Sequence, residues 1–222
     1  MKTTSVMIVG VGGQGSLLAS RLLGTLLTDE GYDVKVSEVH GMSQRGGSVV
    51  TYVRYGEKVY SPIVTEGECD FIISFEKLEA ARYAGCLRKG GKIIVNTQEI
   101  DPMPVITGAA EYPVNVLEEL KAKGFDIDDF DALTPAMEAG SAKSVNIVLM
   151  GHFAKHTDIP KEKWIAALRT HHYEDESLQF LRASSFLFEG SPDVTWTLDG
   201  EAAEGSSRVE IKNIHDAIRL MC

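Results

Sequence analysis

Four glycines and one glutamine follow the first apolar run of the chain, as GVGGQG at positions 10–15. Gly10, Gly12 and Gly15 match the pattern G-x-G-x-x-G, in which glycine permits a tight turn and a close approach to an anion. A helix that begins at such a turn directs free N–H groups at the anion. We predict that Gly10, Gly12, Gly13, Gln14 and Gly15 bind a phosphate-bearing ligand. A tight turn without a ligand is the simpler alternative.

A second polar, glycine-rich segment lies at positions 40–48, with the sequence HGMSQRGGS. It combines an amide, a guanidinium and exposed backbone N–H groups within a few residues, which suits anionic oxygens. We predict phosphate or carboxylate binding here also. The candidate residues are Ser43, Gln44, Arg45, Gly46 and Gly47. The alternative is a glycine-rich loop in which Arg45 faces solvent.

The elements that must position these loops can be read from the apolar pattern. Residues 5–9 are typical of a strand buried on both faces, and residues 16–28 carry leucines at helical spacing. Residues 33–39 and 49–53 predict two more strands, and residues 55–58 predict a hairpin turn into a further short strand at 59–60. We predict an α/β, Rossmann-like three-layer fold with a mostly parallel sheet, a right-handed crossover and an inserted β-hairpin.

Length, composition and cysteine spacing exclude several classes of protein. The chain has 222 residues, of which 44% are hydrophobic and 24% charged, as in ordinary globular proteins. No apolar run approaches the length of a membrane span, and the N-terminus does not resemble a signal peptide. Cys69, Cys86 and Cys222 are far apart and form no CxxC motif, which argues against a disulfide scaffold or cysteine-ligated metal. We expect a cytoplasmic protein with reduced thiols and no membrane partner.

The charge distribution bears on the ligand. The net charge of −10 argues against nucleic acid as a partner. Residues 1–60 carry six Lys and Arg against five Asp and Glu, whereas residues 61–140 carry seven against fifteen. Residues 141–222 carry nine against twelve. The excess acid is absent from the third of the chain that holds both glycine-rich loops, which permits an anion site there.

Other polar residues indicate chemistry less strongly. His152 and His156 are four apart on a helix predicted over residues 141–156, a spacing that could bind metal. No third ligand is evident, so we interpret them as ordinary helix histidines and predict no metal site. The acidic residues at 126–131 lack the glycine and glutamate of an EF-hand, which indicates a solvated surface loop. His40 could orient a carboxylate or donate a proton, or make only a structural hydrogen bond.

The two loop motifs together resemble the gamma-subunit family of 2-oxoacid (pyruvate):ferredoxin oxidoreductases, and most closely the small (beta) subunit of the indolepyruvate type. The long second motif, EVHGMSQRGGSV at 38–49, makes this likeness more specific than the glycine pattern alone. It continues through CDFIISFE at 69–76, GGKIIVN at 90–96 and SVNIVLMG at 144–151. It covers residues 1 to about 169.

The resemblance implies a subunit of a thiamine-diphosphate-dependent complex. Such complexes decarboxylate a 2-oxoacid, pass two electrons through iron–sulfur clusters to ferredoxin and transfer the acyl group to coenzyme A. The indolepyruvate type converts aryl 2-oxoacids to arylacetyl-CoA and CO2. The chain itself has neither a cysteine cluster nor a GDG…N segment for magnesium diphosphate.

The expected division of labour follows from the resemblance. Thiamine diphosphate, Mg2+ and 4Fe–4S clusters are expected on a large partner subunit, with no cofactor bound by this chain alone. Coenzyme A would be a co-substrate, and ferredoxin a partner through the complex. The chain alone would be inactive. Its two loops would provide part of the coenzyme A or 2-oxoacid site.

The end of the chain departs from the family pattern. We predict a catalytic domain over residues 1–185 and an atypical tail of unknown role over residues 186–222. Alternating apolar residues at 194–198 and 209–211 predict a terminal pair of short strands.

Two other functions remain open at this level. The first is a stand-alone NAD(P)-dependent dehydrogenase, because Glu38 lies about twenty residues beyond the glycine loop, where a ribose carboxylate is expected. The second is a nucleotide-sensing regulatory module that uses the same fold without turnover.

Overall fold

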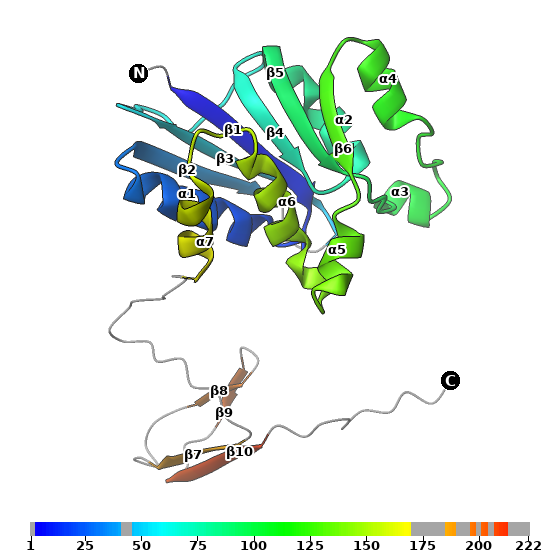
Figure 1. Cartoon of the computed structure of the whole chain (residues 1–222). Coiled ribbons are helices and arrows are strands. Elements are labelled where there is room, and N and C mark those ends of the chain that lie inside the picture. Colours follow the sequence, from blue (N-terminus) through cyan, green and yellow to red (C-terminus); the bar gives the residue numbers. More distant parts are fainter. Residues whose placement is uncertain are drawn as a thin grey trace. The chain divides into compact units, whose positions relative to one another are not determined.

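The computed structural model describes residues 3–40, 46–169, 185–189, 196–198, 201–203 and 207–212. They belong to two compact units, Met1–His172 and Tyr173–Cys222. The family motifs and both glycine-rich loops fall within the first unit. Its centre is a six-stranded sheet with helices on both faces (Figure 1).

The order of strands across this sheet is β2-β3-β1-β4-β5-β6. Strand β3 runs antiparallel to both β1 and β2, whereas β1, β4, β5 and β6 are mutually parallel. The predicted α/β fold with a mostly parallel sheet is therefore confirmed. The antiparallel hairpin consists of β2 and β3, and not of the predicted strands at 49–53 and 59–60. The strand bounds are β1 Thr4–Val11, β2 Asp33–His40, β3 Ser48–Gly56, β4 Cys69–Ser74, β5 Leu87–Asn96 and β6 Asp126–Phe130.

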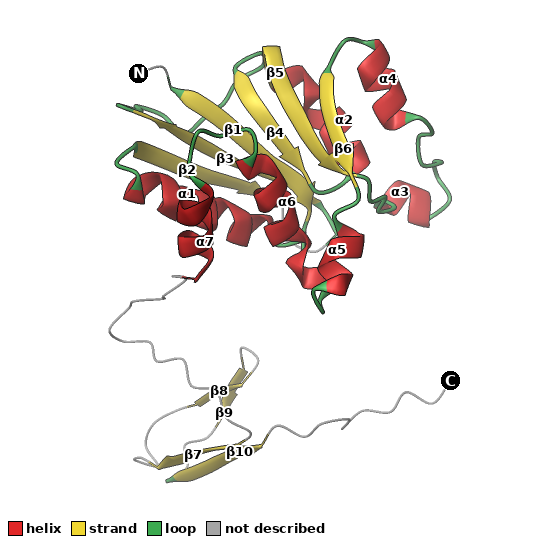
Figure 2. Cartoon of the chain, viewed as in Figure 1, coloured by secondary structure: helices red, strands yellow, loops and turns green. Residues whose placement is uncertain are grey.

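Helices α1, α6 and α7 cover one face of the sheet, and α2 and α4 cover the other (Figure 2). No helix in the described ranges is long and apolar enough to cross a membrane. The α-helical bounds are α1 Ser16–Asp29, α2 Lys77–Tyr83, α3 Met103–Ile106, α4 Val116–Ala122, α5 Leu133–Glu138, α6 Val145–Ala154 and α7 Lys161–Arg169. Two short 3-10 turns cover Ala84–Cys86 and Ala142–Ser144.

The two faces of β1 explain its almost wholly apolar sequence. Val6 and Ile8 pack into the core beneath α1 and α6, while Met7 and Val9 pack into the core beneath α2. All four side chains are fully buried. Successive residues of a strand point to opposite faces, so a central strand covered on both sides needs a continuous apolar run.

Two of the predicted local structures are wrong near the sheet. Residues 57–60 form no strand, because β3 continues to Gly56 and pairs along its length with β1 and β2. The acidic segment 126–131 is not a surface loop: Asp126–Phe130 is strand β6. As an edge strand it leaves carboxylates near solvent, where Lys92 binds Asp126 and Lys121 binds Asp129.

The helix predicted over residues 141–156 is shorter and preceded by a separate turn. A 3-10 turn covers Ala142–Ser144, and α6 runs from Val145 to Ala154. The Ser141 hydroxyl accepts a hydrogen bond from the Lys143 N–H and so begins the turn. His156 therefore lies beyond the end of α6, while His152 lies on it.

The second unit contains short strands, as predicted. They are β7 Ser185–Glu189, β8 Trp196–Leu198, β9 Glu201–Ala203 and β10 Arg208–Lys212. The predicted pairing of residues 194–198 with 209–211 is wrong, because β8 pairs with β9 and β10 pairs with β7. Only two residues of sequence separate β8 from β9, which explains the local partner.

Candidate functional site

The first glycine-rich loop joins the end of β1 to the start of α1. Gly13 and Gly15 have φ angles of 103° and 88°, in the left-handed region that favours glycine. Gly10 is needed for a different reason. A Cβ atom there would lie 2.9 Å from Gln14 Oε1 and 2.9 Å from Phe75 Cβ. The loop is therefore closely packed against the residue that follows β4.

We expect Gly10→Ala to destabilise the chain by about 1–3 kcal/mol, because the added methyl group overpacks the contact with Phe75. Gly151→Ala is the matched control: a Cβ atom at this position in α6 meets nothing within 4 Å. The control should stabilise by about 0.5–1 kcal/mol through helix propensity. Urea unfolding of the full chain measures both changes. Equal stability of Gly10→Ala and wild type would contradict the packing argument.

The third glycine of the motif permits a close contact with α6. A Cβ atom on Gly15 would lie 2.8 Å from Nδ2 of Asn146, which is buried and donates a hydrogen bond to the Gly15 carbonyl at 3.4 Å. Asn146 lies in the motif SVNIVLMG that carries the family resemblance. Helix α6 thus supports the loop from the side opposite β2 and β3.

Gln14 holds the loop from within. Its Oε1 accepts a hydrogen bond from the Val11 N–H at 2.7 Å, and its Nε2 donates to the Phe75 carbonyl at 3.2 Å and to Gln98 Oε1 at 3.4 Å. The Gln14 N–H donates to the Val11 carbonyl at 3.2 Å. The Gln14 side chain therefore already makes hydrogen bonds within the protein, in addition to the ligand contact predicted for it.

The two loops singled out in the sequence meet in space. The Gly12 N–H donates to the Gly47 carbonyl at 2.8 Å, and the Gly46 N–H donates to the Gly12 carbonyl at 3.2 Å. Ser43, Gln44 and Arg45 lie outside the described residues. The structure thus joins the glycine loop to the end of the second loop, where β3 begins.

Two pockets flank the glycine loop and share Gly13 and Gly15 as lining residues. The first, of about 350 Å³, lies toward β2 and β3, and the second, of about 420 Å³, lies toward α5 and α6. Among the described residues, the N–H groups of Gly13, Gly15 and Ser16 have no hydrogen-bond acceptor. The loop and the start of α1 therefore offer N–H groups that have no acceptor within the described part of the chain, between the two pockets.

The charges that line the two pockets differ in sign. Glu38 lines the first pocket, together with Thr51. Lys143 lines the second, together with Gln98 and Asn146. An anion is favoured on the side of Lys143, where the helix dipole and the ammonium group act in the same direction. Hydroxyl groups of a ligand suit the side of Glu38.

Sequence reasoning missed a group of buried acids near the second loop. Glu76 lies two residues after the end of β4 and is almost fully buried. Oε2 of its side chain caps α2 by accepting a hydrogen bond from the Glu79 N–H at 2.9 Å. Burial and the hydrogen bond to Glu76 raise the pKa of Tyr112. Glu79, also buried, accepts from Ser48 Oγ and from Arg82 Nε. The available signal was an acid placed two residues after the end of an apolar strand.

These acids border a third pocket, of about 210 Å³, that Gly46 and Gly47 also line. Arg82 pairs with Glu79 at 3.1 Å and offsets part of the negative charge there. The acids hold α2 and the start of β3 in place through hydrogen bonds. Through Ser48 they help to position the end of the second loop, where β3 begins. Because of the two acids, this pocket does not suit an anion.

The described thiols do not form a reactive or metal-binding group. Cys69 and Cys86 are free, and burial raises the pKa of the Cys69 thiol to about 12. Such a thiol stays protonated near neutral pH and is a poor nucleophile. Its Sγ donates to the Phe71 carbonyl at 2.9 Å.

Comparison with known proteins identifies the family to which the chain belongs. The family model described as pyruvate ferredoxin/flavodoxin oxidoreductase matches residues 5–183. The chain belongs to the pyruvate ferredoxin/flavodoxin oxidoreductase family. The resemblance inferred from the loop motifs is thereby confirmed, and the motifs lie within the matched region.

Relatives within the pyruvate ferredoxin/flavodoxin oxidoreductase family carry two kinds of name. Indolepyruvate oxidoreductase subunit IorB of Thermococcus kodakarensis is 47% identical over 72% of this chain and 81% of its own length. The protein of the same name from Pyrococcus horikoshii is 46% identical over the same shares. The common gamma subunit of pyruvate/ketoisovalerate oxidoreductases of Thermococcus litoralis is 29% identical over 68% of this chain and 77% of its own.

Solved structures of this family share the fold. The pyruvate oxidoreductase subunit PORC of Thermotoga maritima superposes with a TM-score of 0.57 at 18% identity, covering 76% of this chain and 85% of that one. The keto/oxoacid ferredoxin oxidoreductase gamma subunit of Geobacter sulfurreducens gives 0.54 at 20% identity, covering 76% and 86%. These likenesses support the fold and, at this identity, the fold alone.

Proposed function

We propose that the chain is the small subunit of a thiamine-diphosphate-dependent 2-oxoacid:ferredoxin oxidoreductase that acts on aryl 2-oxoacids such as indolepyruvate. The complex would release CO2, form an arylacetyl-CoA and reduce ferredoxin. The observation that carries this proposal is the identity of 47% and 46% to two subunits named for indolepyruvate. The gamma subunit named for pyruvate and ketoisovalerate is more distant, at 29%.

The site proposed on this chain consists of the two joined loops. Gly10, Gly12, Gly13, Gln14 and Gly15 would form one side, and Ser43, Gln44, Arg45, Gly46 and Gly47 the other. Free N–H groups at the start of α1 and the hydrogen bonds between Gly12 and the second loop support this proposal. The ligand would be a phosphate of coenzyme A or the carboxylate of the 2-oxoacid.

The cofactors that carry the chemistry are assigned to the large partner subunit. The cysteines of the described ranges, Cys69 and Cys86, belong to no group of three potential metal ligands. They therefore do not fit a 4Fe–4S cluster, which four thiolates hold. Thiamine diphosphate and Mg2+ would likewise lie on the partner, and this chain would contribute binding and orientation of the co-substrate.

The strand order argues against the stand-alone dehydrogenase. In a dinucleotide-binding fold the second strand lies beside the first, which brings its acidic residue to the ribose. Here β3 separates β2 from β1, so Glu38 is displaced by about one strand spacing, roughly 4.8 Å. Glu38 still lines the pocket beside Gly13 but from a different strand position.

The decisive experiment is co-expression with the large thiamine-binding subunit, followed by a viologen-reduction assay. Indolepyruvate, pyruvate, 2-oxoglutarate and a branched-chain 2-oxoacid are compared with and without coenzyme A. We expect coenzyme A-dependent reduction with the highest kcat/KM for indolepyruvate. Preference for another 2-oxoacid would contradict the aryl assignment. NAD(P) reduction by the chain alone would contradict membership of the complex.

A further inference from the structure

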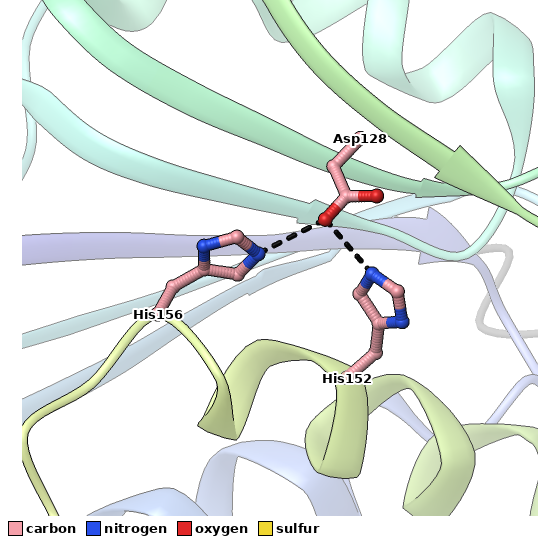
Figure 3. Close-up of side chains that lie close together, drawn as sticks. All are labelled: Asp128, His152 and His156. Carbon is pink, nitrogen blue, oxygen red and sulfur yellow. Dashed lines mark hydrogen bonds and ion pairs between the residues drawn. The ribbon is translucent and has the colours of Figure 1, made fainter.

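Three side chains that the proposed function does not use converge between the outer strand and α6 (Figure 3). Asp128 comes from β6, His152 from α6 and His156 from the turn that follows α6. The Nε2 atoms of His152 and His156 lie 2.8 Å and 2.9 Å from the same carboxylate oxygen, Oδ2 of Asp128. None of the three residues lines a pocket beside the glycine loop.

This arrangement changes the interpretation of two sequence features. The histidines four residues apart lacked a third ligand in the sequence, and the acidic segment was expected to form a solvated loop. Because the segment is strand β6, it brings Asp128 to the two imidazoles. The three potential ligand atoms all lie within 4.8 Å of one another.

The surrounding structure fixes the orientation of these side chains. The His152 ring stacks on Phe130 of the same strand as Asp128, with ring centroids 3.9 Å apart and an interplanar angle of 12°. The backbone N–H of His156 donates to the backbone carbonyl of Phe153, whose side chain is fully buried in the core. The ring of His152 and the backbone of His156 are thus held by packed elements, which lowers the cost of holding a ligand.

The electrostatics suit a cation. The Asp128 carboxylate places one oxygen, Oδ2, beside both imidazole rings. The exposed fractions of the side chains are 31% for Asp128, 16% for His152 and 23% for His156, so water reaches the group. Lys155 Nζ lies 3.5 Å from His152 Nδ1 on an exposed, flexible side chain.

We propose that Asp128, His152 and His156 bind a divalent late first-row metal ion, preferably Zn2+, through Oδ2 and the two Nε2 atoms. Two imidazoles and one carboxylate are a common zinc ligand set, with water in a fourth position. Bonds of about 2.0–2.1 Å at tetrahedral angles place ligand atoms about 3.3 Å apart. Small side-chain rotations from the present contacts achieve this. The ion would link strand β6 to helix α6 and the turn that follows it.

The test uses the untagged full chain, stripped of metal with a chelator, and requires no turnover. Zn2+ is titrated in competition with a chromophoric chelator, and Co2+ is followed by its visible absorption. We expect one strong site with a Kd below about 10 μM and a rise in Tm of roughly 5–10 °C at a hundredfold excess over Kd. Absence of such a site would overturn the proposal, whatever the result of the viologen assay.

Variants distinguish this site from other histidines of the chain. Asp128→Asn and His156→Gln remove one ligand each and should weaken Zn2+ binding about a hundredfold. Gln at position 156 keeps an N–H donor, so the fold should persist, and the Tm without metal checks this. Asp129→Asn is the matched control, because Asp129 is on the same strand but pairs with Lys121. Zn2+ affinity unchanged by Asp128→Asn would show that the group is only hydrogen-bonded.

Discussion

The chain purified without a partner is expected to be colourless and to show no 2-oxoacid turnover, whereas the co-expressed pair is expected to be active. The reason is that neither a cluster-ligand pattern nor a thiamine-diphosphate motif occurs in its sequence. Visible absorption, iron content and the viologen assay measure this directly. A brown preparation with stoichiometric iron, or turnover by the chain alone, would contradict the assignment of the chemistry to the partner.

Assembly is the control for this result. A site that is only partly built on this chain requires a stable hetero-oligomer, whose interface should bury well over about 1,000 Å². Exposed apolar side chains such as Met103, Ile106 and Met137 are available for such contacts. Gel filtration of the co-expressed pair should give a single complex. Independent elution at micromolar concentration would contradict an obligate subunit.

The beginning of the fold could be predicted because its local signals agree. The apolar run of β1, the glycine turn and the leucine spacing of α1 are each produced by neighbouring residues, and all three predict the same β-loop-α unit. The structure places β1 at Thr4–Val11 and α1 at Ser16–Asp29, within two residues of the expected bounds. The strand predicted at 33–39 is likewise β2, Asp33–His40.

The errors arose where distant residues decide the structure. Strand β3 lies between β1 and β2 and pairs with both. The local sequence of residues 48–56 does not indicate which strands will be its partners. In β6 the acidic residues Asp126, Asp128 and Asp129 obscure the strand, because an edge position and partners such as Lys92 and His152 make the charges acceptable.

The two loops could be proposed as a candidate site from the sequence, but the contacts that join them could not. The sequence indicates two loops, and the hydrogen bonds between Gly12 and residues 46–47 that join them depend on the position of β3. Position 15 requires glycine because the side chain of Asn146, more than a hundred residues later in the sequence, leaves no space for a Cβ atom. The internal hydrogen bonds of Gln14 likewise depend on Phe75.

The second prediction of large effect concerns the residues expected to contact the ligand. Arg45→Ala should remove a charge-assisted pair worth roughly 1.5–3 kcal/mol. In the assembled complex this corresponds to a loss of about tenfold to a hundredfold in apparent affinity for coenzyme A or the 2-oxoacid. Saturation curves for both substrates measure the loss. Gel filtration must first show that the variant assembles with its partner.

Two further substitutions separate the competing explanations of such a loss. Gly12→Val should have a larger effect, because a side chain at this position would occupy space that the phosphate of a ligand needs. Glu38→Gln is the control: a dehydrogenase that uses this carboxylate on a ribose should lose NAD affinity, whereas a ferredoxin-linked complex has no NAD dependence to lose. If Arg45→Ala assembles normally and leaves both saturation curves unchanged, the proposal that the second loop binds the anion is wrong.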